Sequence, residues 1–287
     1  MKKSLGRNKL IIVCAMLLII MLAGCSVSNS QVIDTNLDSA SNDAKISKQA
    51  ASQKKEIVVS AAASISVVMD NIIAQFEAEH ADIAVEVNYG SSGTLQKQIE
   101  QGAPVDLFVS AATKQMNALE EQGLLEAMLP LLNNEIVIVG NRELVDVALA
   151  ESATIALLLK QVNPTFIAMG EPDSVPAGQY AKQVLQHEQL WDVWTKHYVY
   201  AKDVRQVLTY VEQGNAELGF VYLSDAMSSN KVNIIHHIDS ATHDPITYPI
   251  AILKSSKQMD AAQLFFDYLL HEDRTVLYEQ YGFKRAE

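Results

Sequence analysis

The sequence predicts an α/β protein in which parallel sheets are flanked by helices. Strand-like segments alternate with helix-like segments from residue 56 almost to the end of the chain. The length of 287 residues and the hydrophobic content of 49% fit one large or two modest folded domains. In such sheets, binding sites lie outside the carboxyl ends of the strands, so functional residues are expected there.

The first half of this pattern contains four strands and three helices. In residues 65–79, for example, apolar residues recur every three or four positions and so share one face of a helix. Gly123 follows the last of these helices and is typical of a helix end. The predicted strands are 57–61, 83–89, 105–111 and 136–140, and the predicted helices are 65–79, 94–101 and 114–122.

The second half continues the same alternation. Its strands are short apolar runs such as LGFVY and YPIAIL. The predicted strands are 166–170, 198–201, 218–222, 232–236 and 248–253, and predicted helices begin at 178 and 204 and cover 259–270 and 273–281.

The amino terminus has the pattern of a secretory signal. Four basic residues precede an apolar run at 10–23, which is too short for a comfortable membrane span but suits a signal-peptide core. The following LAGC resembles a bacterial lipobox, which implies that 1–24 is removed and that Cys25 carries lipid. The alternatives are an uncleaved anchor helix and an ordinary signal peptide with a chance cysteine.

Residues 25–55 are expected to form the lipidated Cys25 and a flexible tether, because they are rich in Ser, Asn, Asp, Gln and Lys. The other cysteine, Cys14, lies in the signal, so no internal disulfide is expected. Loss of four of the 22 basic residues leaves 18 against 34 acidic ones, a net charge of −16. This balance argues against nucleic-acid binding, and any anion site must be a local arrangement of dipoles.

Four strand ends lead into a helix start with a small or hydroxyl residue nearby. A helix start exposes backbone N–H groups without intrahelical partners and carries the positive end of the helix dipole. Together these features make an anion site without a cationic side chain. The four positions are Ser64 in AAAS, Ser92 in YGSSGT, Ala177 in SVPAG and Val204 in AKDV.

Simpler explanations exist for each position. Ser64 or Ser92 taken alone is better explained as a helix cap, and Tyr222 as a half-buried packing residue. His236, His237 and His243 lack the spacing of a metal site. No nucleophile elbow, phosphate-binding loop or dinucleotide fingerprint is present.

The set of segments, in this order, resembles the molybdate-binding proteins that serve ATP-driven molybdate importers. The resemblance covers most of residues 56–287. Several long matches carry it, whereas SSGT alone means little. They are VVSAAASI (58–65), YGSSGTLQKQIEQGAPVDLFVSA (89–111), EPDSVPAGQYAKQVL (171–185), AKDVRQVLTYVEQGNAELGFVYLSDA (201–226), YPIAIL (248–253) and YGF near the end.

The resemblance implies a two-lobed periplasmic-binding-protein-like fold of type II. Each lobe would be a mostly parallel sheet flanked by helices, and two hinge crossings near 133–141 and 245–250 would join the lobes. The implied division is 56–133 plus 247–287 for the first lobe and 134–246 for the second.

The resemblance also implies an oxyanion site between the lobes. Ser64 and Ser92 would donate from the first lobe through hydroxyl and backbone N–H groups. Ala177 and Val204 would donate backbone N–H groups from the second lobe, and Tyr222 its phenolic O–H. Gly93 stands where the family often has a third serine and would keep only a backbone donor. A donor-only site suits a fully deprotonated dianion and disfavours phosphate.

The implied function is capture of molybdate, and of tungstate, by a monomer outside the cytoplasm that is anchored to the membrane through Cys25. The protein would deliver its ligand to an ABC permease, would not be an enzyme, would use no cofactor, and would hold molybdenum only as molybdate. Three alternatives remain. They are the same fold with another ligand such as sulfate or an organic acid, an extracytoplasmic hydrolase using Ser64 or Ser92, and a surface interaction protein without a small ligand.

Overall fold

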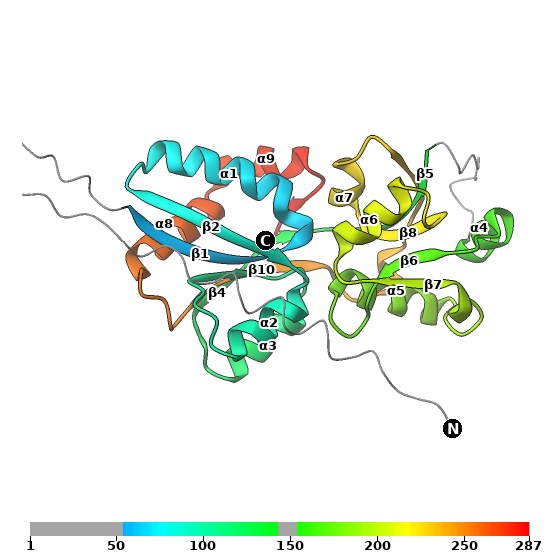
Figure 1. The fold of residues 1–287 in the computed structure, drawn as a ribbon, viewed down its shortest axis with the longest axis horizontal. Coiled ribbons are helices and arrows are strands. Elements are labelled where there is room, and N and C mark those ends of the chain that lie inside the picture. Colours follow the sequence, from blue (N-terminus) through cyan, green and yellow to red (C-terminus); the bar gives the residue numbers. More distant parts are fainter. Residues whose placement is uncertain (1–53, 143–153, 287) are drawn as a thin grey trace, which may run out of the picture. The chain divides into compact units, whose positions relative to one another are not determined.

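The computed structural model describes residues 54–142 and 154–286. The predicted signal peptide, Cys25 and nearly all of the predicted tether lie outside these residues. Within them, the chain forms two separate β-sheets, each with its own helices (Figure 1). We call the sheets with their helices the first and second lobes.

The first lobe contains a six-stranded sheet in the order β11-β4-β10-β3-β1-β2. Its strands are β1 (Lys55–Ala62), β2 (Ile83–Gly90), β3 (Leu107–Val109), β4 (Leu125–Asn133), β10 (Thr247–Leu253) and β11 (Lys284–Arg285). Helices cover both of its faces, with α1 and α8 in one buried cluster and α2 and α3 in another. The helices are η1 (Ala63–Ile65), α1 (Ser66–Glu79), α2 (Ser92–Glu100), α3 (Thr113–Glu121), α8 (Met259–Leu270), η4 (Glu272–Arg274) and α9 (Thr275–Gln280).

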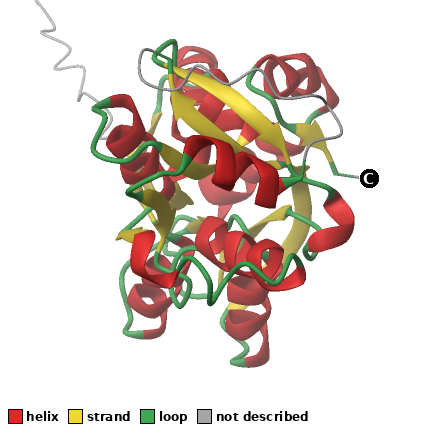
Figure 2. Cartoon of the chain, turned by 90° about the vertical axis from the view of Figure 1, so that its right-hand side faces the viewer, coloured by secondary structure: helices red, strands yellow, loops and turns green. Residues whose placement is uncertain are grey.

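The second lobe contains a five-stranded sheet in the order β7-β6-β8-β5-β9. Its strands are β5 (Ile136–Asn141), β6 (Ile167–Gly170), β7 (Tyr198–Ala201), β8 (Leu218–Tyr222) and β9 (Val232–His237). Its helices are α4 (Ile155–Val162), α5 (Pro176–His187), η2 (Thr195–His197), α6 (Val204–Glu212), α7 (Leu223–Met227) and η3 (Ser240–Thr242). The strands between the helices are visible in Figure 2.

Both sheets are mixed, whereas each was predicted to be mostly parallel. Strand β1 runs parallel to β2 and β3, but β10 is antiparallel to β3 and β4. In the second lobe β6 is parallel to β7 and β8, while β5 is antiparallel to β8 and β9. The antiparallel strands β5 and β10 are those by which the chain enters the second lobe and returns to the first. Side-chain patterns do not reveal strand direction, so the sequence did not show this.

Strand β4 was not predicted, and it contains Pro130, although a proline inside a run argues against a sheet interior. Pro130 is accommodated opposite Pro249 of β10, beside an irregularity in the register. Since neither proline has a backbone N–H, their pairing places two missing donors at one point of the ladder. Helices α4 and α7 were also not predicted, and both are short.

The chain passes between the sheets twice. The first crossing joins β4 to β5 through residues 134 and 135, and the second joins β9 to β10. The Asn134 backbone N–H donates to Ile246 O at 3.0 Å, so the two crossings are paired. The first lies within the predicted hinge segment 133–141, whereas the second, residues 238–246, ends where the predicted segment 245–250 begins.

Helix α5 packs directly on β6 through two glycines. A Cβ atom added to Gly178 would lie 2.0 Å from Gly170 O, so no larger residue fits without moving the backbone. At Gly90, by contrast, the nearest atom to an added Cβ is Leu95 Cδ2 at 3.4 Å, an ordinary contact.

We therefore expect Gly178→Ala to lower the free energy of unfolding by about 1–3 kcal/mol, the usual cost of overpacking. Gly90→Ala is the matched control and should change it little. Urea unfolding of both variants measures the difference. Equal stability of the two variants would show that α5 can move away from β6 without cost.

Candidate functional site

A small cavity lies between the lobes at the carboxyl ends of several strands. Measured to the centres of water-sized spheres, it has a volume of about 10 Å³, which is room for about one water molecule. All five residues predicted to contact a ligand line it, namely Ser64, Ser92, Ala177, Val204 and Tyr222.

Three helices begin at this cavity. Helix α2 begins at Ser92, α5 at Pro176 and α6 at Val204. The backbone N–H groups of Ala177 and Val204 are among those that a helix leaves without an intrahelical acceptor. The positive ends of the three helix dipoles add to these donors, so the cavity favours negative charge without a Lys or Arg side chain in its lining.

Neither predicted serine acts as a helix cap. Helix α2 is capped by Ser91, whose Oγ accepts from Thr94 N, and η1 has no side-chain cap. Ser92 Oγ instead accepts from Ala111 N at 2.9 Å, and Ser64 Oγ lies 2.8 Å from the hydroxyl of Tyr248. Both serines are buried, and the simpler explanation of each as a cap is wrong.

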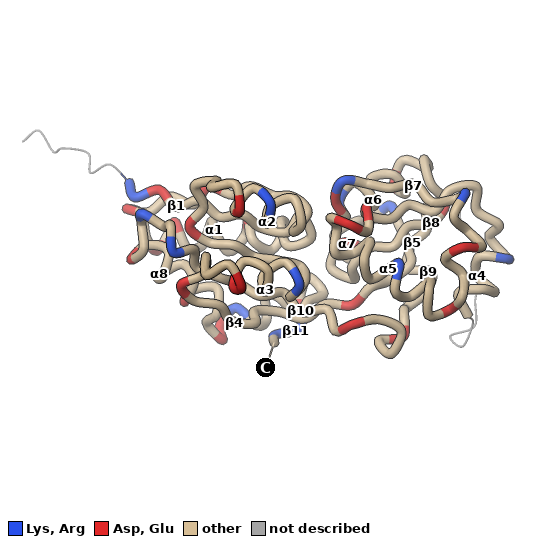
Figure 3. The backbone as a smooth tube through the Cα atoms, turned by 90° about the horizontal axis from the view of Figure 1, so that it is seen from below, with Lys and Arg blue, Asp and Glu red and all other residues tan. Residues whose placement is uncertain are grey.

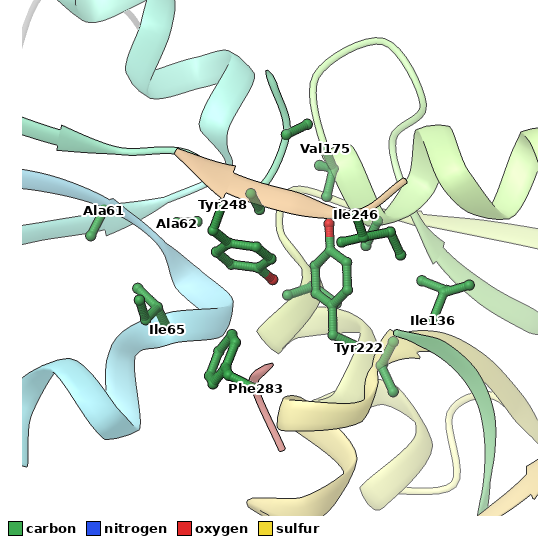
Figure 4. Close-up of a cluster of buried hydrophobic side chains, with 14 of the residues drawn as sticks. Ala61, Ala62, Ile65, Ile136, Val175, Tyr222, Ile246, Tyr248 and Phe283 are labelled. Atoms are coloured by element: carbon green, nitrogen blue, oxygen red, sulfur yellow. The ribbon is translucent and has the colours of Figure 1, made fainter. Parts of the chain in front are cut away.

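Tyr222 brings a buried phenol to the cavity from the end of β8. Its side chain is 1% exposed, and its hydroxyl makes no hydrogen bond within the described part of the chain. The ring meets Tyr248 edge-on with centroids 5.6 Å apart (Figure 4). Burial raises the pKa of Tyr222 well above its ordinary value, so the phenol keeps its proton. A buried donor without an acceptor is costly, which points to an acceptor supplied from outside the chain.

Gly93 differs from its prediction. Its N–H donates across the lobes to Ser174 O at 3.0 Å, so this donor is used by the protein itself. A Cβ at this position would lie 2.5 Å from the same oxygen, so the absence of a side chain lets the two backbones meet. The N–H of Gly178, which follows the predicted contact Ala177, donates to Val175 O.

The lining was predicted to consist of donors alone, and this prediction is wrong. Asp203 also lines the cavity, and its Oδ1 accepts from Gln206 N at 2.8 Å as the cap of α6. The capping role explains why an acidic residue lies in the lining, because a carboxylate accepts hydrogen bonds from the exposed N–H groups of a helix start.

Sequence reasoning missed three polar residues that pack near the cavity or at the first crossing. Asn134 Nδ2 donates a hydrogen bond to the hydroxyl of Tyr248, and Asp225 is fully buried in α7. Tyr248 and Asp225 were visible as polar residues in the apolar segments YPIAIL and VYLSDA. Their roles could not be predicted, because their partners lie far away in the sequence.

Burial raises the pKa of Asp225 to about 7, although the positive charge of Arg205 opposes this shift. The two side chains form a pair with Arg205 Nη1 at 3.7 Å from Asp225 Oδ1, which is longer than a hydrogen bond. Arg205 therefore offsets only part of the free-energy cost of burying the charged form of Asp225.

Within residues 54–142 and 154–286, no group of three or more His, Cys, Asp and Glu side chains is arranged to hold a metal ion. His236 and His237 are neighbours at the end of β9. Acidic and basic residues are interspersed along both lobes (Figure 3).

None of the helices in the described part of the chain is long and apolar enough to cross a membrane.

The fold and the cavity between the lobes define a two-lobed solute-binding protein. The family described as bacterial extracellular solute-binding protein matches residues 57–284, and the chain belongs to this family.

Three relatives refine the comparison. The chain is 39% identical over 280 residues to YvgL of Bacillus subtilis (strain 168), provisionally named an ABC transporter substrate-binding lipoprotein, with 95% of this chain and 96% of YvgL covered. It is 34% identical over 242 residues to the molybdate-binding protein ModA of Escherichia coli (strain K12), covering 83% and 92%. Among solved structures, the substrate-binding domain of a provisionally assigned molybdenum ABC transporter from Clostridium difficile is 41% identical, with a TM-score of 0.62 and coverage of 82% and 100%.

The raised pKa of Asp225 predicts a pH-dependent stability. Between its ordinary pKa of 3.8 and about 7, the folded protein keeps a proton that the unfolded chain releases. The contribution of Asp225 to stability therefore falls as pH rises through this window, and the full cost is present above pH 7. We expect Asp225→Asn to be more stable than the parent at pH 8, with a smaller difference at pH 5.

Chemical unfolding at the two pH values measures this effect. Asp192→Asn is the control, because Asp192 is an exposed acid of the same lobe. An Asp225→Asn effect of the same size at both pH values would show that Asp225 does not titrate in this window.

Proposed function

We propose that this protein captures molybdate, and also tungstate, between its two lobes outside the cytoplasm and delivers it to an ABC permease. One observation carries the proposal. The buried hydroxyl of Tyr222 lacks an acceptor among the described residues, at a cavity where three helices begin and two serine hydroxyls lie. The similarity to ModA and to the Clostridium difficile domain supports molybdate as the ligand.

The proposed contacts are hydrogen bonds to the oxygens of a tetrahedral dianion. Ser64, Ser92 and Tyr222 donate hydroxyl protons, and Ala177 and Val204 donate backbone N–H groups. The helix dipoles supply positive potential, so no cationic side chain is required. The protein binds and releases its ligand unchanged, and we assign no catalytic residue.

Discrimination against phosphate is part of the proposal. Phosphate keeps a proton near neutral pH and needs an acceptor in its site. The carboxylate of Asp203 is the acidic group in the described lining, and it is already engaged by the start of α6. Sulfate carries no such proton, so its discrimination depends on the size of the cavity.

We further propose that the protein is a monomer held at the membrane by lipid on Cys25. The LAGC segment and the lipoprotein name of YvgL support this anchor. The permease would recognise the closed protein, and ATP would be hydrolysed by a separate subunit.

Calorimetric titration of the 26–287 fragment with molybdate, tungstate, sulfate and phosphate tests the ligand. We expect one-to-one binding of molybdate and tungstate, with sulfate and phosphate much weaker. No heat with molybdate in folded, ligand-free protein would contradict the proposal, and preferential binding of sulfate would favour the alternative ligand. Turnover of an ester that is lost in Ser64→Ala would instead revive the hydrolase.

Tyr222→Phe removes a single donor from the site. We expect molybdate binding to weaken by about 1–3 kcal/mol, the usual range for a hydrogen bond to a charged group. Tyr198→Phe is the matched control in the same lobe, because the Tyr198 hydroxyl donates to Trp191 O at 3.0 Å. If both variants bind as tightly as the parent, Tyr222 is not a ligand contact.

A further inference from the structure

A chain of hydrogen bonds leads from the first crossing to the cavity. Asn134 Nδ2 lies 3.2 Å from the hydroxyl of Tyr248, and this hydroxyl lies 2.8 Å from Ser64 Oγ. Asn134 belongs to the first crossing, Tyr248 to β10, and Ser64 to the lining of the cavity. The YPIAIL segment that contains Tyr248 has no role in the proposed contacts with the ligand.

The orientation of the Asn134 amide is set by its surroundings. Its Oδ1 accepts from Glu135 N at 2.8 Å, which a nitrogen in that place could not do. Nδ2 therefore faces Ser224 Oγ at 2.9 Å and the hydroxyl of Tyr248. Since an amide nitrogen only donates, the Tyr248 oxygen accepts at this end of the chain.

The proton of Tyr248 is then directed to Ser64. Tyr248 is 0% exposed, and Ser64 Oγ is the one acceptor within hydrogen-bond distance of its hydroxyl in the described structure, once Asn134 is assigned as a donor. Burial raises the pKa of Tyr248 well above its ordinary value, so the phenol stays protonated. Ser64 Oγ thus receives a hydrogen bond, and its own proton is left for another partner.

We propose that Tyr248 is a positioning residue that holds the Ser64 hydroxyl as a donor toward the bound oxyanion. The inference rests on the proposed function, because the acceptor for the Ser64 proton is the ligand. Figure 4 shows Tyr248 below β10, beside Tyr222 and between the two lobes. Tyr248 itself does not line the cavity and acts through Ser64.

The same arrangement gives the site a means of selection. A serine hydroxyl that rotates freely can donate to one ligand and accept from another. With one of its two acceptor positions filled by Tyr248 and its own proton left free, Ser64 has a preference for ligands that bring a lone pair. Hydrogen phosphate, which brings a proton, gains nothing there. Loss of Tyr248 should therefore narrow the preference for molybdate over phosphate as well as weaken molybdate binding.

A double-mutant cycle tests whether Tyr248 acts through Ser64. Molybdate and phosphate Kd values are measured by calorimetry for the parent, Tyr248→Phe, Ser64→Ala and the double variant. We expect each single change to weaken molybdate binding about tenfold, the loss of one hydrogen bond to a charged group. The double variant should bind about as weakly as Ser64→Ala alone, because without Ser64 there is no serine hydroxyl for Tyr248 to orient.

Tyr278→Phe is the matched control in the first lobe. Tyr278 is also buried, but its hydroxyl donates to Leu269 O at 3.0 Å, and Tyr278 does not line the cavity. This variant should bind molybdate as the parent does. If Tyr248→Phe does not fold, Asn134→Ala in the two Ser64 backgrounds replaces it, since it removes the donor that sets the direction of Tyr248.

Two results would overturn the inference while the proposed function stands. In one, the losses for Tyr248→Phe and Ser64→Ala multiply in the double variant, so that Tyr248 acts independently. In the other, Ser64→Ala binds molybdate as tightly as the parent, so that the serine hydroxyl donates to Tyr248 instead. Failure of the parent protein to bind molybdate would refute the proposed function itself.

Discussion

The site depends on hydrogen-bond donors that are buried where the lobes meet. Tyr222 keeps its proton and has no acceptor among the described residues, and Ala177 and Val204 have N–H groups at helix starts. Folding that buries such donors costs free energy unless an acceptor fills the space between them. The fold therefore places the need for an acceptor between its two lobes, and an acceptor that binds there favours the arrangement in which both lobes contact it.

Backbone contact between the lobes requires small residues. Gly93 lets its N–H reach Ser174 O across the lobes, and Gly178 lets α5 lie against β6, which sets the position of Ala177. These glycines do not contact the cavity, yet they determine how closely its walls approach. The residues at the start of α5, in the segment EPDSVPAG, thus have two different roles. Pro176 and Ala177 line the cavity, while Gly178 lets α5 pack against Gly170 of β6.

Local patterns in the sequence predicted most strands and helices and marked four helix starts as possible anion sites, because alternation, helical spacing and the chemistry of helix starts are properties of short segments. The grouping of these four positions with Tyr222 at one site came from the resemblance to the molybdate-binding proteins. The direction of β5 and β10, the paired prolines 130 and 249, and the bond between Ser64 and Tyr248 all join distant segments. The last of these spans 184 positions, and no local pattern encodes such a partner. Asp203 was missed as a lining residue for a different reason, since a cap is recognisable locally but its exposure to the cavity is not.

The site favours an anion through oriented hydrogen-bond donors and not through charged side chains. The whole chain has a formal net charge of −12, which repels anions at long range. At short range, Ala111 N donates to Ser92 Oγ, and in the arrangement that we propose Tyr248 donates to Ser64 Oγ, so each serine has one acceptor position filled. Each serine therefore meets a ligand with its proton, as Tyr222 does. A Lys or Arg would attract every anion, protonated or not, whereas a set of oriented hydroxyl donors favours ligands that bring only lone pairs. An acidic protein can thus hold a dianion selectively, because the direction of each donor is fixed before the ligand arrives.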